Sequence, residues 1–256
     1  MVQCFSLEAP TRALSGETNA YVVGREDGLL IDPATRQPAL DAVVEAQVGH
    51  VAVTHHHPDH VSGVRSYADE YDLTVWARAG RHESFESAAG MEPDRTFTPG
   101  QTIPAAGGIP VLDTPGHAPE HVAFAVSNGF VTGDLAVSEG SVVVGAPQGD
   151  MRAYLSSLRR LYARSPDRLY PGHGSIIDDP RSTCERLIKH RLDRERRVLE
   201  AIQEGNETPE EIVDAAYEKD IRAVYDLARA TVIAHIEKLA HEGKVTFDDE
   251  RAISTK

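Results

Sequence analysis

Four histidines and one aspartate stand within the six residues 55–60, directly after an apolar, β-branched segment. Polar side chains at such density are costly to bury unless a partner binds them. In extended backbone, residues two apart point to the same side, so His55 and His57 can aim both imidazoles at one point. Asp59 and His60 follow where the chain turns into a helix, and they can present a second pair of ligands.

Three more candidates end apolar segments, and each follows a glycine that lets backbone approach a crowded site. Imidazole nitrogens and carboxylates suit Zn²⁺ or a similar divalent metal. One metal could take His55, His57 and His117, another could take Asp59, His60 and His173, and Asp134 could bridge both. We therefore expect two Zn²⁺ per chain, with Fe or Mn as alternatives. The seven predicted ligands are His55, His57, Asp59, His60, His117, Asp134 and His173.

Short apolar segments and amphipathic segments alternate along the first 180 residues, which indicates layered α/β structure. Asn128 and Gly129 form a strong turn signal within a predicted hairpin. Other ranges, 78–100 above all, are polar and carry no clear pattern. Strands are predicted at 19–24, 27–34, 50–55, 72–77, 108–117, 121–134 and 168–174, and helices at 38–48, 59–71 and 151–164.

After Pro180 the pattern becomes helical and highly charged. The spacing predicts helices at 184–205, 208–218 and 227–243, with Thr208 as an N-cap and Gly243 after the last helix. A strand-like segment follows at 244–250. We expect a first domain over residues 1–180 and a small helical domain over residues 181–256.

The composition restricts location and partners. The formal net charge is −14, which argues against a broad nucleic-acid footprint. No apolar run approaches 18 residues and the first residues do not resemble a signal peptide, so we expect a cytoplasmic protein without a membrane span. Two cysteines do not make a disulfide framework.

The motifs together resemble the metallo-β-lactamase fold superfamily. They are "LLIDPA" with Asp32, "THHHPDH" at 54–60, "TPGH", "VTGD" and "PGHG", in the family's order across residues 15–180. The resemblance implies a four-layer αββα sandwich with a dinuclear zinc site at one edge, and it implies the same seven ligands. It makes Asp32 a supporting residue beside the site. His56 should point away, and His121 either faces the site or caps a strand.

The resemblance also implies metal-assisted hydrolysis. Two metals lower the pKa of a shared water, and the resulting bridging hydroxide attacks an ester, thioester, amide or phosphodiester. By the same resemblance, Asp59 orients the attacking water and is the expected catalytic residue. On the predicted helix 184–205, His190, Arg191 and Arg194 are candidates for contacting a substrate anion, or else belong to a solvated charged face.

The tail is similar to that of the β-lactamase-like protein 2 group, which carries a winged-helix-like domain and includes a single-strand-specific endoribonuclease. RNA is therefore one predicted substrate, and a small ester or thioester, as in glyoxalase II-like enzymes, is another. Two alternatives stay open: a mononuclear iron persulfide dioxygenase and a metal-stabilised winged-helix interaction protein without catalysis. Residues 206–256 carry 12 acidic and 7 basic residues, so we expect no DNA binding. Packing against the first domain and a homodimer contact are the alternative roles of this tail.

Overall fold

The computed structural model describes residues 1–13 and 15–255, and the chain divides into two compact units. The first unit comprises Met1–Thr114, Glu120–Val142 and Arg164–Thr183. The second comprises Pro115–Pro119, Val143–Ala163 and the chain from Cys184 onward. The second unit thus includes residues well before position 180, and the expected division at that position stays a prediction.

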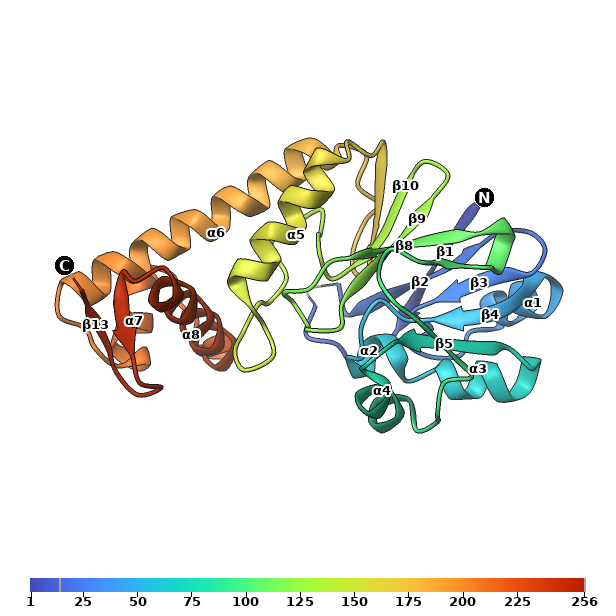
Figure 1. Cartoon of the computed structure of the whole chain (residues 1–256), viewed down its shortest axis with the longest axis horizontal. Helices are drawn as coiled ribbons and strands as arrows, with labels where there is room; N and C mark the ends of the chain where they lie inside the picture. The colour runs from blue at the N-terminus through green and yellow to red at the C-terminus, as the bar shows by residue number, and fades with distance from the viewer. Residues whose placement is uncertain (14, 256) are drawn as a thin grey trace. The chain divides into compact units, whose positions relative to one another are not determined.

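The first sheet of the first unit has six strands, which follow one another across the sheet in chain order (Figure 1). The first three strands pair antiparallel, and the last four pair parallel. The carboxyl ends of β3, β4 and β5 therefore meet at one edge. The strands are β1 (Val2–Glu8), β2 (Glu17–Val23), β3 (Gly28–Ile31), β4 (Val48–Ala52), β5 (Thr74–Arg78) and β6 (Arg95–Phe97).

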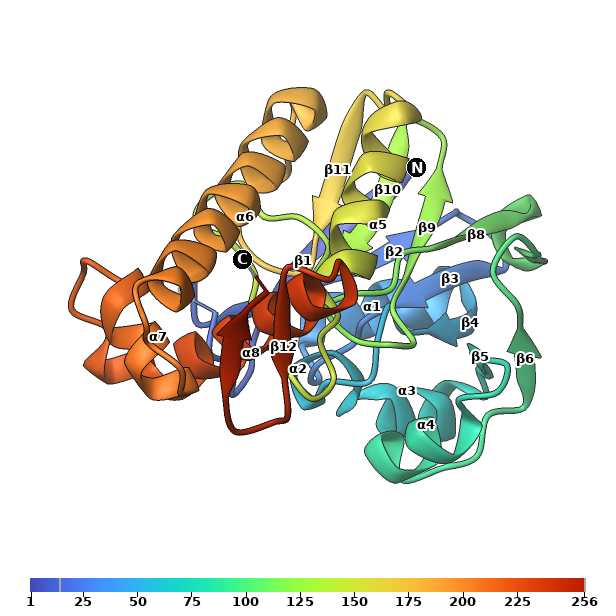
Figure 2. The ribbon, with the colours of Figure 1, turned by 60° about the vertical axis from the view of Figure 1, so that its left-hand side comes forward.

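The second sheet has five strands in the order β11-β10-β9-β8-β7. Figure 2 shows β9, β10 and β11 side by side. The predicted hairpin is confirmed, since β9 and β10 pair antiparallel around Asn128, and β10 pairs parallel with β11. The strands are β7 (Thr102–Ile103), β8 (Ile109–Asp113), β9 (Val122–Val126), β10 (Gly129–Gly133) and β11 (Arg168–Pro171), and a short 3-10 helix, η1 (Ala105–Gly107), joins β7 to β8.

Apolar side chains cover both faces of the first sheet, as expected where parallel strands are buried on two sides. Leu30 packs into a cluster with residues of the helices, whereas Leu29 and Ile31 pack into a cluster shared with the second sheet. This alternation follows the two-residue period of a strand. The helices of this unit are α1 (Pro38–Gln47), α2 (Pro58–Val61), α3 (Val64–Tyr71) and α4 (His82–Ala89).

One local prediction needs correction. The helix expected over 59–71 is broken into α2 and α3, because the backbone N–H of Gly63 donates to the carbonyl of Pro33, at 2.8 Å, instead of to the preceding helical turn. A Cβ at this position would lie 2.2 Å from the carbonyl oxygen of Pro33, so glycine permits the close backbone approach at which α2 ends. The polar range 78–100 does contain regular structure, namely α4 and β6.

The second unit is mainly helical. A capping box joins Thr208 and Glu211 at the start of α7, which confirms the predicted N-cap. The apolar side chains of α7, α8 and the last turns of α6 form one buried cluster with the two-stranded ribbon. The elements are α5 (Met151–Ala163), α6 (Pro180–Gln203), α7 (Pro209–Ala216), η2 (Arg222–Val224), α8 (Tyr225–His241), β12 (Val245–Phe247) and β13 (Ala252–Ser254).

The described part of the chain has no helix that is both long enough and apolar enough to cross a membrane.

Candidate metal centre

Strand ends deliver the polar side chains of the site. Asp32 follows β3, the segment 53–57 follows β4, Asp134 follows β10 and His173 follows β11. Parallel neighbours end at the same edge of a sheet, so β3 with β4, and β10 with β11, each present their residues together. The short helix α2 then begins at Pro58 and carries Asp59 and His60.

The structure brings the seven predicted ligands into three groups, and in each group the ligand atoms lie within 4.8 Å of one another. Two of these groups equal the two sets that the sequence suggested. His117 belongs to the loop 115–119, whose ends join Thr114 and Glu120 of the first unit. The groups are His55, His57 and His117; His55, His60 and Asp134; and Asp59, His60 and His173.

Hydrogen bonds to oxygen acceptors fix which ring nitrogens face the groups. His117 Nδ1 lies 2.6 Å from the carbonyl oxygen of Val143, and His173 Nδ1 lies 2.7 Å from that of Glu17. A carbonyl only accepts, so Nδ1 carries the proton in both rings and Nε2 is the ligand nitrogen. His55 Nε2 lies 3.0 Å from His57 Nδ1, which places two imidazole nitrogens at one point.

Asp32 lies behind this arrangement, fully buried and with a left-handed φ of 54°. Its Oδ1 accepts from the backbone N–H of Thr54 at 2.6 Å, and its Oδ2 accepts from the Thr54 hydroxyl at 2.7 Å. The same Oδ2 lies 3.0 Å from His60 Nδ1. The Thr54 oxygen in turn lies 3.0 Å from His55 Nδ1. One carboxylate thus orients two histidines, His60 directly and His55 through Thr54.

Charge at the second set of ligands is concentrated. His60 Nε2 lies 3.3 Å from His173 Nε2, and Asp134 Oδ1 lies 3.5 Å and 3.4 Å from those two nitrogens. Asp59 Oδ2 lies 3.6 Å from His173 Nε2. Burial opposes the charged form of His60, but Asp32 and then Asp134 outweigh it and raise its pKa to about 9. Burial likewise opposes the charge on His173, whereas Asp134 raises its pKa.

This donor set fits a divalent cation. The ligand atoms are imidazole nitrogens and carboxylate oxygens, all held within contact distance, and a positive charge between them would relieve the crowding of two carboxylates. Space also matches, since a Cβ at Gly172 would lie 2.6 Å from Asp134 Oδ1 and 2.7 Å from His60 Cε1. The glycine before His173 therefore keeps this volume open.

His56 and His121 stand outside the three groups. His56 Nδ1 lies 3.1 Å from the Ser84 hydroxyl, and its backbone N–H donates to Glu120. Burial, the largest influence, lowers the pKa of His56. His121 is fully buried, with Nδ1 2.9 Å from the Thr114 hydroxyl and its ring centroid 5.3 Å from that of His55. His121 thus packs beside a predicted ligand.

Two of the candidates on α6, Arg191 and Arg194, contact aromatic rings of the second unit. The Arg194 guanidinium lies 3.5 Å from the centre of the Tyr217 ring and donates to the carbonyl of Ala216. The buried Arg191 lies over the ring of Tyr154. Burial and then the Arg191 charge lower the pKa of His190 to about 4. A role of these side chains toward a substrate stays a prediction.

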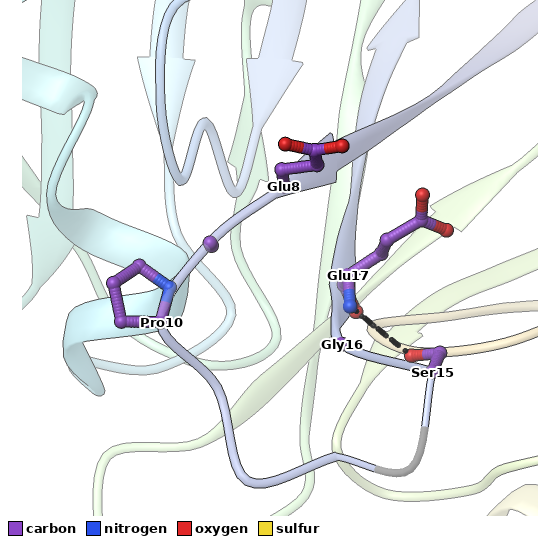
Figure 3. A pocket seen from close by; sticks show the side chains of 6 residues that line it. Glu8, Pro10, Ser15, Gly16 and Glu17 are labelled. Atoms are coloured by element: carbon purple, nitrogen blue, oxygen red, sulfur yellow. Dashed lines mark hydrogen bonds between the residues drawn. The ribbon is translucent and has the colours of Figure 1, made fainter.

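Two features of the site were not anticipated. Thr54 gives a sequence signal only by its place, as the hydroxyl residue between a strand and the first ligand. A shallow, open pocket of about 470 Å³ lies beside the loop between β1 and β2 (Figure 3). Its lining includes the carboxylates of Glu8 and Glu17, and Glu17 is also the residue whose carbonyl accepts from His173.

Comparison with known proteins agrees with this geometry. A family model described as Metallo-beta-lactamase superfamily matches residues 15–173, and one described as Beta-lactamase associated winged helix domain matches residues 208–253. A Beta-lactamase-like protein 2 homolog of Drosophila melanogaster is 30% identical over 213 residues, which cover 78% of this chain and 71% of the relative.

An Atrochrysone carboxyl ACP thioesterase of Aspergillus fumigatus is 28% identical over 272 residues, covering 94% of this chain and 61% of the relative. The crystal structure of a metallo-β-lactamase family protein from Thermus thermophilus superposes with a TM-score of 0.77 at 22% identity, covering 99% of this chain and 98% of that one. The predicted resemblance and the predicted fold class, including the winged-helix-like tail, are confirmed.

Proposed function

The chain belongs to the metallo-β-lactamase superfamily, a family of metal-dependent hydrolases, and we propose that it hydrolyses a carboxylic ester or thioester with two divalent ions. The proposed ions are Zn²⁺, because most of the predicted ligands are histidines and zinc binds imidazole nitrogen well. Magnesium prefers sites made of oxygen ligands alone. Bound there, two such ions would supply a water of lowered pKa and would polarise the substrate carbonyl.

The observation that carries the proposal is the pair of ligand groups that meet through shared residues. The group of His55, His60 and Asp134 shares His55 with one of the other two groups and His60 with the other, so all three groups are connected. Such sharing supports two neighbouring ions, to both of which Asp134 could contribute an oxygen. It counts against the mononuclear iron alternative, for which Asp59 and His60 would be surplus.

The chain's own residues would have separate tasks in this reaction. Asp59 is partly exposed, unlike the buried His60 beside it, so its carboxylate can accept a hydrogen bond from water and orient it. Asp32 and Thr54 would hold the rings of His60 and His55 in one tautomer and one direction.

Charge favours a neutral acyl substrate over RNA. The pocket at the loop between β1 and β2 carries two carboxylates, Glu8 and Glu17, and the chain has a net charge of −14. A polyanion such as RNA would be repelled by the two carboxylates and by the negative net charge of the chain. The Aspergillus fumigatus relative is named a thioesterase, which supports the same substrate class. A homodimer contact by the second unit and a cytoplasmic location stay predictions.

The test is a hydrolysis panel with the zinc-loaded protein. It compares aryl esters, acyl thioesters, lactones, single-stranded RNA and a phosphodiester reporter, each with and without a chelator. We expect chelator-sensitive turnover of esters or thioesters. Faster cleavage of RNA than of every acyl substrate would overturn the proposed substrate class, and one iron per chain with consumption of O₂ would point to dioxygenase chemistry.

The matched variant is Asp59→Asn, compared with Asp69→Asn on the exposed face of α3. Loss of the orienting carboxylate should lower kcat roughly 10²- to 10⁴-fold. The Asp69→Asn variant removes the same charge from an exposed residue that belongs to none of the three ligand groups, and it should keep full activity. Equal turnover in the two variants would contradict the role given to Asp59.

A further inference from the structure

Strand β2 is longer than β3, its neighbour on one side. Its pairing with β1 runs over all of Glu17–Val23, whereas its pairing with β3 covers only Tyr21, Val22 and Val23. The backbone of residues 17–20 on that side therefore extends past the end of β3. An open strand edge has N–H and C=O groups that need partners.

The turn that carries His173 takes up this edge. The backbone N–H of Asn19 donates to the carbonyl of Gly172 at 2.8 Å, and the ring of His173 donates from Nδ1 to the carbonyl of Glu17 at 2.7 Å. The turn also hydrogen-bonds to its own sheet, through the N–H of Gly172 and the carbonyl of Gly133 at 2.9 Å. It is thus held between the two sheets of the first unit.

The side chain of Asn19 completes this attachment. It is buried, with 5% of its surface exposed, and its amide nitrogen donates to the carbonyls of both Pro171, at 3.0 Å, and Gly174, at 2.8 Å. Those carbonyls lie on either side of the Gly172-His173 pair. An amide offers two N–H groups, and both are used to hold the two ends of one turn.

We propose that Asn19 is a positioning residue for His173, an inference that rests on the proposed role of His173 as a metal ligand. Ligand side chains must be held within about 0.5 Å of their productive position, and hydrogen-bonding neighbours supply that accuracy. Without the amide, the carbonyl of Gly174 loses its donor, and the bonds of Gly172 and of the His173 ring are left to set the direction of that ring. The hydroxyl of Tyr21 also donates to the carbonyl of Pro171, at 2.6 Å, so one end of the turn has a second side-chain donor.

The test is a double-mutant cycle read out by metal binding. Stepwise affinities for Zn²⁺ are measured by chelator competition, and Co²⁺ absorption reports the coordination of each ion. The proteins are the wild type, Asn19→Ala, His173→Ala and the double variant. We expect Asn19→Ala to weaken one of the two ions 10- to 100-fold, with altered Co²⁺ bands. In the His173→Ala background the same substitution should change affinity less than twofold, because it acts through His173.

Thr18→Val is the matched control. Thr18 is buried in the same strand, and within the described residues its hydroxyl has no hydrogen-bond partner. It should leave both affinities unchanged. If Asn19→Ala does not fold, Asn19→Ser, which keeps one donor, carries the cycle with a smaller expected loss.

An equal loss of affinity in both backgrounds, or no loss in either, would overturn the role of Asn19. If His173→Ala itself leaves metal binding unchanged, the ligand assignment fails and the inference fails with it. A wild type that binds two ions and loses one on His173→Ala, yet is indifferent to substitution at Asn19, refutes the inference and leaves the proposed function standing.

Discussion

Replacing Asp32 by Asn keeps the shape of the buried site and reverses the two hydrogen bonds that Oδ2 accepts, from Thr54 and from His60. Asn tolerates the left-handed φ of 54° that this position requires, so the backbone is not strained. The side-chain oxygen must stay toward the N–H of Thr54, which can only donate. The new amide nitrogen then faces both the Thr54 oxygen and His60 Nδ1, and its two N–H groups donate to them.

That reversal moves the proton of His60 to the wrong nitrogen. With Nδ1 as acceptor, the neutral ring carries its proton on Nε2, the atom that lies 3.3 Å from His173 Nε2 within the ligand group. Before a metal can bind at Nε2, the ring must return to the tautomer with its proton on Nδ1. In the variant, that N–H no longer has the Asp32 carboxylate as its acceptor. Changes in such supporting residues weaken metal binding about 10- to 100-fold. That range equals about 1.4 to 2.8 kcal/mol of binding free energy.

The measurement is the Zn²⁺ affinity of Asp32→Asn against wild type by chelator competition, with Asp69→Asn as a control for charge. Circular dichroism should show an unchanged fold. An affinity for both ions within twofold of wild type would refute the argument that Asp32 sets the tautomer of His60. A loss of the same size in Asp69→Asn would assign the effect to net charge instead.

Two further substitutions test packing and pH dependence. Gly172→Ala places a Cβ 2.6 Å from Asp134 Oδ1, so we expect Zn²⁺ affinity to fall at least about tenfold while far-ultraviolet circular dichroism stays unchanged, and wild-type affinity would contradict the crowding argument. Burial and then Arg191 lower the pKa of His190 to about 4 in the folded protein. As pH falls, the unfolded chain therefore binds a proton at His190 before the folded protein does. Stability should therefore fall as pH drops from about 6.5 through 4, and His190→Gln should show a smaller fall in urea midpoint between pH 7 and 4.5 than wild type.

Much of the site could be predicted because its ligands are encoded locally. The alternation of His55 and His57 on extended backbone and the turn into α2 depend on neighbouring residues alone. The strand endings before Asp134 and His173 carry short glycine motifs that can be seen in the sequence. The helix N-cap at Thr208 was predictable for the same reason, since a capping box spans only four residues.

What required the tertiary structure involves partners far apart in the chain. Asn19 and Gly174 are separated by 155 residues, and Asp32 and His60 by 28, so no local pattern records their hydrogen bonds. The break at Gly63 likewise depends on the carbonyl of Pro33, which only the packed chain places there.

The sequence by itself determined which chemistry the protein can hold, because residue type and short-range spacing set the available ligand atoms. Only the tertiary structure decided how those atoms are oriented. It set His56 against Ser84 and His121 against Thr114, outside the three ligand groups, although all twelve histidines are alike in type. The physical reason is that a ring's direction and tautomer follow from the acceptor behind it, and that acceptor comes from another element of the fold.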